Sequence, residues 1–286
     1  MTTPDQSMTQ EMRDAQGRVL VFDSGMGGLT VAREICQMAP ALKVDYAADT
    51  GFFPYGDKSD EALRARLPDV AEALVREAQP DVFVIACNTA STLALDEVRA
   101  RLDIPVVGTV PAIKPAASLT RTGVIGLLAT PGTIRRAYTA KLIEDFASEI
   151  TVILHGSVEL VRLAEAFAAG EAYDGGGFTA ALAPIFDAKD GGEVDTIVLA
   201  CTHFPLVRAQ LAAAAPDGVT FIDSGAAIAR QTLRVLEGAA PQPRTGEAGG
   251  RLYITDEGGD HGRLVKVCGR FGFDRVCPPV LLPAER

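Results

Sequence analysis

The sequence predicts an α/β protein of two pseudo-symmetric three-layer domains with mostly parallel sheets and an active site in the cleft between them. Short apolar runs alternate with amphipathic stretches along the 286 residues, as in strands joined by helices. The pattern of the run Asp81–Thr89 recurs as Asp195–His203, with identical residues at four of nine positions and an offset of 114 (195 minus 81). Such a repeat indicates two similar halves, and we expect their cleft to receive both repeated strands.

The first half alternates strands with helices. Apolar runs bounded by turn residues predict strands at 19–22, 44–47, 82–85 and 104–109, and amphipathic spacing predicts helices from Leu29 toward Pro40, at 60–78 and through Leu93, Leu95 and Val98. The loop Asp49–Ser59 is too rich in aromatic and turn residues to be a mere linker. Val110–Pro115 contains two prolines and is the candidate hinge.

The second half repeats this order. Strands are expected at 123–128, at 150–154 and in the second copy of the repeat, followed by the run Thr220–Gly225, and helices are expected from 133 to about 146, at 157–169 and at 228–236. Residues 171–177 form a glycine-rich loop, and Gly238–Gly250 has a linker composition. The tail at 251–286 is expected to contain a strand, a helix to about Phe271 and a last short strand.

These elements predict the domain boundaries. The first domain should comprise residues 18–113 and 226–286, because the tail is expected to pack back on the first half, and the second domain should comprise residues 114–225. Residues 1–17 are polar and lack the apolar core of a secretory signal, so we expect a disordered tail.

Composition excludes several classes of protein. The net charge of −10 is unfavourable for binding nucleic acid or an anionic membrane surface. No apolar run approaches the length needed to span a bilayer. The five cysteines, at 36, 87, 201, 268 and 277, are odd in number and scattered, which indicates a reducing cytosol rather than a disulfide framework.

The repeat places a thiol at the end of each of two buried strands. Val82–Ile85 is an unbroken apolar run, typical of a strand buried on both faces, and Cys87 follows at its carboxyl end, where open parallel sheets bind their ligands. Cys201 occupies the same place in the second copy. A lone cysteine is often a packing residue. The duplication argues for a function, whereas Cys36, Cys268 and Cys277 lack this context.

Three interpretations of the paired thiols compete. A metal site would use Cys87, Cys201 and His203, but the usual ligand spacings are absent. A hydrolase or transferase would use one cysteine with His203 as its base, which leaves the second thiol without a role. Racemisation or epimerisation by two bases uses both thiols, one taking a proton from a stereocentre and the other delivering a proton to the opposite face. This third interpretation explains the duplication.

Each thiol needs a partner that tunes it, because a free thiol has a pKa of about 8.5. Asp23 could orient Cys87 or receive a substrate ammonium group, and His203 could donate to Cys201 or shuttle its protons. Asp23 lies in the glycine-rich turn at 23–28, which matches neither the dinucleotide fingerprint nor the Walker A motif. This turn could hold an anion, or it could be only a tight connection. Pyridoxal chemistry would need a placed lysine, for which loop residue Lys58 is a poor candidate, so we expect no cofactor and no metal.

The chain resembles the cofactor-independent glutamate racemases of bacteria from about Val19 to Arg230, while the end of the chain matches little. The motifs that carry the resemblance are Phe-Asp-Ser-Gly-x-Gly-Gly at 22–28, Pro-Tyr-Gly-x-Lys-Ser at 54–59, Ala-Cys-Asn-Thr-Ala at 86–90, Gly-Leu-Leu-Ala-Thr at 126–130 and Cys-Thr-His-Phe-Pro-Leu at 201–206. The resemblance implies interconversion of L- and D-glutamate, a supply of D-glutamate for peptidoglycan and hence for cell shape, and a cytoplasmic enzyme. The expected assembly is a homodimer.

The resemblance also implies roles for individual residues. Cys87 should act on the D-enantiomer and Cys201 on the L-enantiomer. The residues expected to line the substrate are Asp23, Ser24, Tyr55, Gly56, Asn88, Thr89, Thr202 and His203. Asp49 and Glu159 match acidic positions that the family places near the site, although both could be capping or surface charges, and Thr130 ends one of the motifs. Ala200 replaces a glycine that is common before the second cysteine.

The substrate poses an electrostatic problem. Glutamate carries two carboxylates, and the motifs contain no arginine and only Lys58 as a cation. Hydroxyl, amide and backbone N–H groups would have to bind these carboxylates, which predicts modest affinity. Two rivals remain, namely an aspartate racemase and a non-catalytic amino-acid-binding protein. The loop at 54–56 and His203 favour glutamate, because aspartate enzymes usually have Glu at the position of His203.

Overall fold

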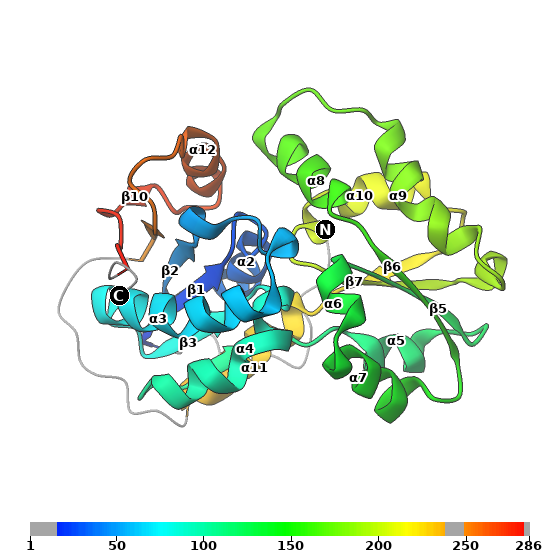
Figure 1. Cartoon of the computed structure of the whole chain (residues 1–286), viewed down its shortest axis with the longest axis horizontal. Coiled ribbons are helices and arrows are strands. Elements are labelled where there is room, and N and C mark those ends of the chain that lie inside the picture. The colour runs from blue at the N-terminus through cyan, green and yellow to red at the C-terminus, as the bar shows by residue number, and fades with distance from the viewer. Residues whose placement is uncertain (1–15, 238–248, 283–286) are drawn as a thin grey trace.

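The computed structural model describes residues 16–237 and 249–282. They form two sheets, each built of parallel strands, which lie side by side (Figure 1). The first sheet has six strands in the order β10-β9-β2-β1-β3-β4, and the second has four in the order β6-β5-β7-β8. All described strand pairs are parallel. The expected α/β class with mostly parallel sheets is therefore confirmed.

The first sheet is covered by helices on both faces. Its strands are β1 (Arg18–Asp23), β2 (Lys43–Ala48), β3 (Val82–Ile85), β4 (Val106–Gly108), β9 (Arg251–Ile254) and β10 (Arg275–Val276). One face packs against α2 (Leu29–Met38), α11 (Gly225–Glu237) and α12 (Gly262–Arg270), and the other packs against α3 (Asp60–Ala78) and α4 (Asn88–Arg101). Alternate residues of β1 enter the two cores, which explains its unbroken apolar sequence.

The second sheet is likewise a central layer. Its strands are β5 (Val124–Ala129), β6 (Thr151–Gly156), β7 (Thr196–Ala200) and β8 (Thr220–Ile222). One face packs against α8 (Glu159–Ala169), α9 (Gly176–Phe186) and α10 (Arg208–Ala214), and the other packs against α5 (Ile113–Leu119) and α7 (Ala137–Ala147). The short helix α6 (Pro131–Arg135) directly precedes α7.

The two sheets repeat one topology. The order β2-β1-β3-β4 of the first corresponds to β6-β5-β7-β8 of the second, and β4 at 106–108 maps onto β8 at 220–222 with the same offset of 114 as the sequence repeat (220 minus 106). The carboxylates that begin the two copies act alike, since Asp81 accepts from the N–H of Arg18 at 2.7 Å and Asp195 from that of Arg121 at 2.7 Å. Cys87 and Cys201 therefore occupy equivalent strand ends.

Some expected elements differ from the structure. The helix expected from 133 to about 146 is interrupted at Arg136, whose backbone is extended at φ −77° and ψ 142°. Helices α9 and α10 were not expected, and α9 begins inside the glycine-rich segment 171–177 because its following residues are almost all apolar and pack on the sheet. Helix α5 begins within the candidate hinge at Ile113.

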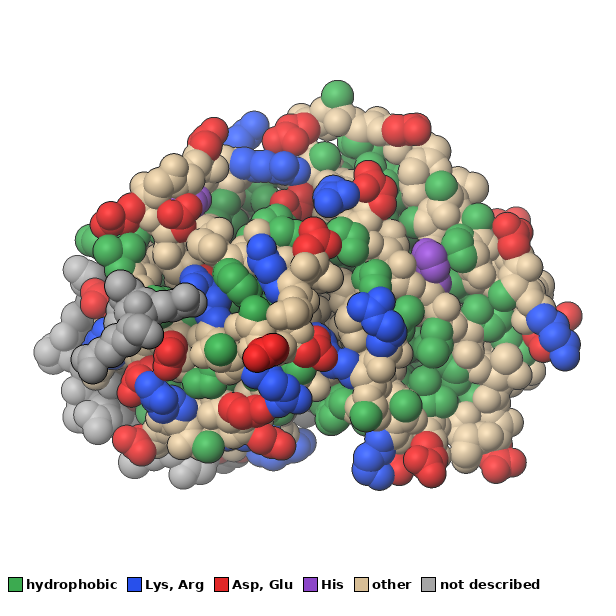
Figure 2. All heavy atoms as spheres, in the orientation of Figure 1, with side chains coloured by type: hydrophobic (Ala, Val, Ile, Leu, Met, Phe, Trp, Pro, Cys, Tyr) green, Lys and Arg blue, Asp and Glu red, His purple; other side chains and the backbone are tan. Residues whose placement is uncertain are grey.

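The remaining expectations concern the ends of the chain. The strand, helix and strand expected after residue 251 are confirmed as β9, α12 and β10, which extend the first sheet. The tail expected at 1–17 and the linker expected at 238–250 lie almost wholly outside the described residues. None of the described helices is long and apolar enough to cross a membrane. On the face drawn in Figure 2, acidic and basic side chains are interspersed.

Candidate active site

Both thiols line one cavity between the two sheets. Cys87 follows β3 and Cys201 follows β7, and their residues are only 5% and 6% exposed. The cavity has a volume of about 20 Å³. Its lining residues are Ser24, Phe53, Pro54, Tyr55, Gly56, Cys87, Asn88, Thr89, Thr130, Val158, Val161, Cys201, Thr202 and His203. Except for Asp23, every residue expected to line the substrate is present in this set.

Cys87 lies at the N-cap position of α4. Burial and the charge of Asp23 raise the pKa of Cys87 to about 12, while the backbone N–H groups of Ala90 and Thr89 oppose this rise. The thiol itself makes no capping hydrogen bond. The positive N-terminal end of α4 favours the thiolate, the form that can accept a proton, but burial and Asp23 outweigh this effect.

Cys201 has a different partner. Its Sγ lies 3.9 Å from Nδ1 of His203, and Nε2 of His203 lies 3.1 Å from Oε1 of Glu165 on α8. Burial lowers the pKa of His203, but the contacts with Cys201 and Glu165 outweigh it and hold this pKa well above the usual value. An imidazolium at this place has an N–H on Nδ1 that faces the sulfur of Cys201. The expected pairing of His203 with Cys201 is thus present in the structure.

Asp23 lies behind the cavity wall at the end of β1 and is fully buried. Its Oδ2 accepts a hydrogen bond from the hydroxyl of Thr202 at 2.8 Å, and its Oδ1 accepts from the N–H of Gly25 at 2.9 Å. Asp23 therefore connects the glycine-rich turn of the first sheet to the residue that follows Cys201. Its charge raises the pKa of the Cys87 thiol.

The glycine-rich turn itself must be narrow. A Cβ on Gly27 would lie 2.5 Å from Oγ1 of Thr202 and 2.6 Å from Nδ1 of His203. Glycine at this position permits the turn to pack directly on Thr202 and His203, the two residues that follow Cys201. The turn is therefore both a tight connection and part of the site.

Asp49 does not line the cavity but supports a residue that does. Its Oδ2 accepts a hydrogen bond from the hydroxyl of Tyr55 at 2.6 Å, and its two carboxylate oxygens accept from Arg66 at 2.7 Å each. The hydroxyl of Thr255 donates to Oδ1 at 2.5 Å. A fully buried carboxylate with this many partners fixes the loop that carries Tyr55.

The structure corrects the expectation for Glu159. Its side chain is 81% exposed and pairs with Arg162 on the surface, away from the cavity. The acidic residue of α8 that contacts the site is Glu165, through His203, and sequence reasoning missed it. Val158, Val161 and Glu165 are spaced by three and four residues and so share one face of the segment containing α8. An acidic residue on that otherwise apolar face was the signal that could have found it.

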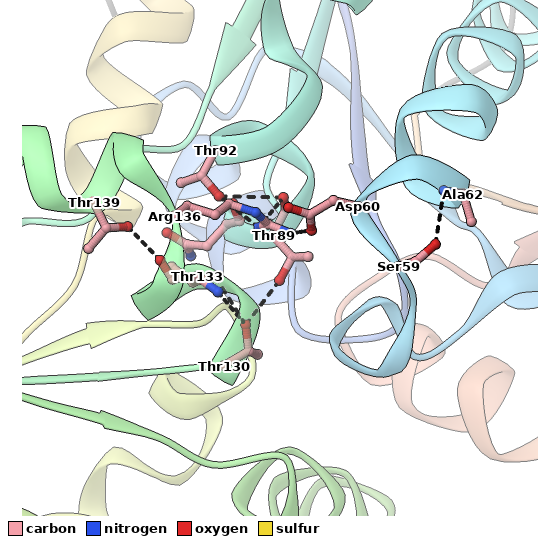
Figure 3. A network of polar contacts seen from close by, with 10 residues as sticks. Ser59, Asp60, Ala62, Thr89, Thr92, Thr130, Thr133, Arg136 and Thr139 are labelled. Atoms are coloured by element: carbon pink, nitrogen blue, oxygen red, sulfur yellow. Dashed lines mark hydrogen bonds and ion pairs between the residues drawn. The ribbon is translucent and has the colours of Figure 1, made fainter.

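The cavity wall is uncharged apart from its titratable thiols and imidazole. None of the described lining residues is Lys or Arg, and Lys58 lies over the ring of Phe52, 4.8 Å from its centroid. Oδ1 of Asn88 is buried without a hydrogen-bond partner among the described residues, as expected for a group that a ligand satisfies. Hydroxyl groups of Thr89 and Thr130 meet at 3.2 Å across the cleft (Figure 3).

The fold and the cavity together define a doubly repeated parallel α/β protein with one buried thiol from each half on the wall of a shared cavity. Residues 26–232 match the family described as Asp/Glu/Hydantoin racemase. The chain belongs to this racemase family, which makes it an isomerase.

Curated relatives and solved structures of glutamate racemases are similar to this chain. The glutamate racemase of Klebsiella pneumoniae is 44% identical over 260 residues, covering 91% of each chain. The crystal structure of Escherichia coli glutamate racemase in complex with L-glutamate and the activator UDP-MurNAc-Ala is similar, with a TM-score of 0.88 and 42% identity over 94% of this chain and 100% of that chain. A Bacillus anthracis glutamate racemase gives a TM-score of 0.74 at 27% identity, covering 93% and 97%. The similarity thus extends beyond the expected range of Val19 to Arg230.

Proposed function

We propose that the protein is a glutamate racemase that interconverts L- and D-glutamate by two-base proton transfer between Cys87 and Cys201. The observation that carries this proposal is the placement of both thiols, at equivalent strand ends of an internal repeat, on the wall of one cavity. The L-glutamate named with the similar Escherichia coli structure supports the choice of substrate. D-glutamate would supply peptidoglycan synthesis and thereby cell-wall biogenesis.

The proposed reaction breaks one Cα–H bond and forms another. With L-glutamate, the thiolate of Cys201 takes the α-proton and becomes a thiol. The electron pair left on Cα is delocalised into the adjacent carboxylate. The thiol of Cys87 then gives its proton to the opposite face of Cα and becomes a thiolate. The reverse reaction begins from this state. Two thiols supply both bases, so the proposed reaction takes no cofactor and no metal.

The neighbours of each thiol suit these roles. The imidazolium of His203, held by Glu165, stabilises the thiolate of Cys201. The N–H groups at the start of α4 stabilise the thiolate of Cys87. In this proposal the buried charge of Asp23, which acts on Cys87 from behind the cavity wall, attracts the substrate ammonium group toward that side. These different supports let two equivalent positions act in opposite directions.

The substrate carboxylates would be bound by neutral donors. Ser24, Thr89, Thr130 and Thr202 present hydroxyl groups, and Asn88 presents an amide. Without a guanidinium or ammonium group on the cavity wall, affinity should be modest. A dissociation constant for glutamate far below micromolar would contradict this binding mode.

The cleft must open to admit substrate. A cavity of about 20 Å³ holds about one water molecule, far less than glutamate needs. The described structure therefore corresponds to a closed cleft, and we propose that the first domain, residues 18–113 with 226–286, moves relative to the second, residues 114–225. Packing of α11 against α2 supports assigning the tail to the first domain.

Two further properties belong to the proposal. The five cysteines of the sequence are all free thiols, which fits a cytoplasmic enzyme. We also propose a homodimer, to be tested by sedimentation.

Substrate choice can be tested by circular dichroism. We expect the signal of L-glutamate to decay to zero in the presence of the protein, while that of L-aspartate persists. Decay with aspartate alone would instead indicate an aspartate racemase. Decay with neither, together with saturable amino-acid binding, would indicate a binding protein.

A further inference from the structure

Arg136 interrupts a helix and reaches across the cleft. Its extended backbone separates α6 from α7, and its side chain is buried at the edge of the second sheet, with the residue only 8% exposed. Its Nη1 donates to the carbonyl oxygen of Thr89 at 2.9 Å and to the hydroxyl of Thr92 at 3.0 Å, and its Nη2 donates to Oδ1 of Asp60 at 2.7 Å (Figure 3). All three partners belong to helices of the first sheet, α3 and α4.

One of these contacts is made to a peptide group in the first turn of α4, the helix whose N-cap is Cys87. The carbonyl of Thr89 and the N–H of Ala90 belong to the same peptide group. Arg136 binds the oxygen of this group, and the N–H of this group is the third of α4, one of those that face the side chain of the N-cap residue, here Cys87. A cation bound at the oxygen of a peptide polarises its N–H and makes it a stronger donor. The guanidinium therefore acts on Cys87 through a single rigid, planar unit.

Asp60 holds the guanidinium in place. The carboxylate is 56% exposed, whereas the arginine side chain is 8% exposed, so the pair lies at the boundary between solvent and the cleft. The hydrogen bond from Arg136 holds the pKa of Asp60 below its usual value, so Asp60 remains ionised. Cys201 has no such connection, because its partner is His203.

We propose that Arg136 is a positioning residue for Cys87, which holds and polarises the Thr89–Ala90 peptide so that its N–H stabilises the Cys87 thiolate when the two sheets close on each other. Its hydrogen bonds reach the Cys87 side of the cleft, whereas Cys201 has His203 as its partner. The assignment of Cys87 as a base rests on the proposed function, but the effect on its thiol does not.

Titration of the thiols tests this role more directly than activity does. The two enantiomers are equally stable in water, so any change in kcat/KM must be equal in both directions and cannot show which base was affected. Alkylation of the folded full-length protein by iodoacetamide, followed over pH with each cysteine quantified by peptide mass spectrometry, reports both thiols in one sample. The thiolate is the reacting form, so the midpoint of each rate profile gives the pKa of that thiol.

The variants are Arg136→Met and Arg136→Lys, with Arg135→Met as the matched control because Arg135 is the adjacent, exposed arginine of α6. In Arg136→Met we expect the Cys87 midpoint to rise and its alkylation below the midpoint to slow by about threefold to tenfold. The Cys201 profile should not change. Arg136→Lys should give a smaller shift in the same direction, and Arg135→Met none.

An unchanged Cys87 midpoint in folded Arg136→Met would overturn the proposal, as would equal shifts of both thiols, which would indicate general loosening of the cleft. If Arg136→Met fails to fold, the same titration is made with Arg136→Lys and with Asp60→Asn, which removes the charge that holds the guanidinium. The absence of a shift in the Cys87 midpoint in both variants would overturn the proposal. Failure of the proposed function is distinguishable, because the unmodified protein would then leave the circular dichroism of L-glutamate unchanged whatever the thiols show.

Discussion

Oε1 of Glu165 lies 3.1 Å from Nε2 of His203, and Nδ1 of the same ring faces Sγ of Cys201 at 3.9 Å. The carboxylate therefore fixes the orientation of the imidazole and favours its charged form next to the thiol. Cys87 has no imidazole partner and is influenced instead by Asp23 and by the amides of α4. The two thiols are equivalent in the fold but differ in their electrostatic environment.

Replacing Glu165 by Gln should lower both activity and the pKa of His203. The loss of a charge that raises this pKa shifts the alkaline limb of the kcat/KM profile to lower pH, and we expect a decrease of about tenfold to a hundredfold at pH 8. Activity measured from pH 6 to 10 checks this. Glu159→Gln is the matched control, because Glu159 is exposed on the same helix. Equal profiles for the two variants would contradict the account.

Glu165→Gln should also change how the free energy of unfolding depends on pH. The pKa of His203 is higher in the folded state than in the unfolded state, where it is about 6.5. The contacts of the charged imidazole therefore stabilise the fold fully below about pH 6.5. This stabilisation is lost as pH rises through the folded-state pKa. Glu165→Gln removes part of this contribution, so its destabilisation should be larger at pH 6 than at pH 10. Urea unfolding at the two pH values measures it, and a larger effect at pH 10 would contradict the assignment.

Gly27→Ala should displace Thr202 and His203, the two residues that follow Cys201. The added methyl group would lie within 2.7 Å of Thr202 and His203, so the loop must move away from Asp23. We expect at least about a tenfold loss of kcat/KM, because small displacements of catalytic groups are costly. Gly192→Ala, whose methyl group meets nothing within 4 Å, is the control and should retain activity. Full activity in Gly27→Ala would show that this approach is not needed.

Asp49→Asn should loosen the loop that carries Tyr55. The substitution weakens a buried ion pair with Arg66 and a hydrogen bond from Thr255, and we expect a loss of about 2 kcal/mol in the free energy of unfolding together with a raised KM. Thermal unfolding and initial rates measure both effects. Asp57→Asn removes a half-exposed carboxylate from the same loop and should change neither.

Replacement of either candidate base should abolish racemisation. Serine is a far weaker base than a thiolate at neutral pH, so Cys87→Ser and Cys201→Ser should each lose at least about a hundredfold in rate by circular dichroism. Cys36→Ser, which changes a thiol outside the cavity, should retain activity. Substantial activity in either of the first two variants would remove that thiol from the mechanism.

The sequence predicted the sheet class and the placement of the thiols because both depend on local patterns. Unbroken apolar runs at 82–85 and 197–200 indicate buried strands, and the repeat of one pattern in the other implies equivalent strand ends. Motif residues from Ser24 to His203 consequently meet at one cavity. These features need no knowledge of how distant segments pack.

The supporting residues could not be predicted in this way, because their roles arise from tertiary contacts. Glu165 reaches His203 over a separation of 38 residues, Thr255 reaches Asp49 over 206, and Arg136 reaches Thr89 over 47. The helix break that releases the side chain of Arg136 has no proline or glycine at the break itself. Glu159 was chosen by motif position, and only the packing of α8 distinguishes it from Glu165.

Deuterium incorporation at Cα in heavy water tests the two-base proposal most directly. Starting from either enantiomer, the account predicts that solvent deuterium appears first in the product enantiomer, while recovered substrate keeps its protium at early times, because one thiol removes the proton and the other delivers a different one. In Cys87→Ser and Cys201→Ser, exchange should occur from one enantiomer only or not at all. Equal early labelling of substrate and product in the unmodified protein would indicate a single base and contradict the account.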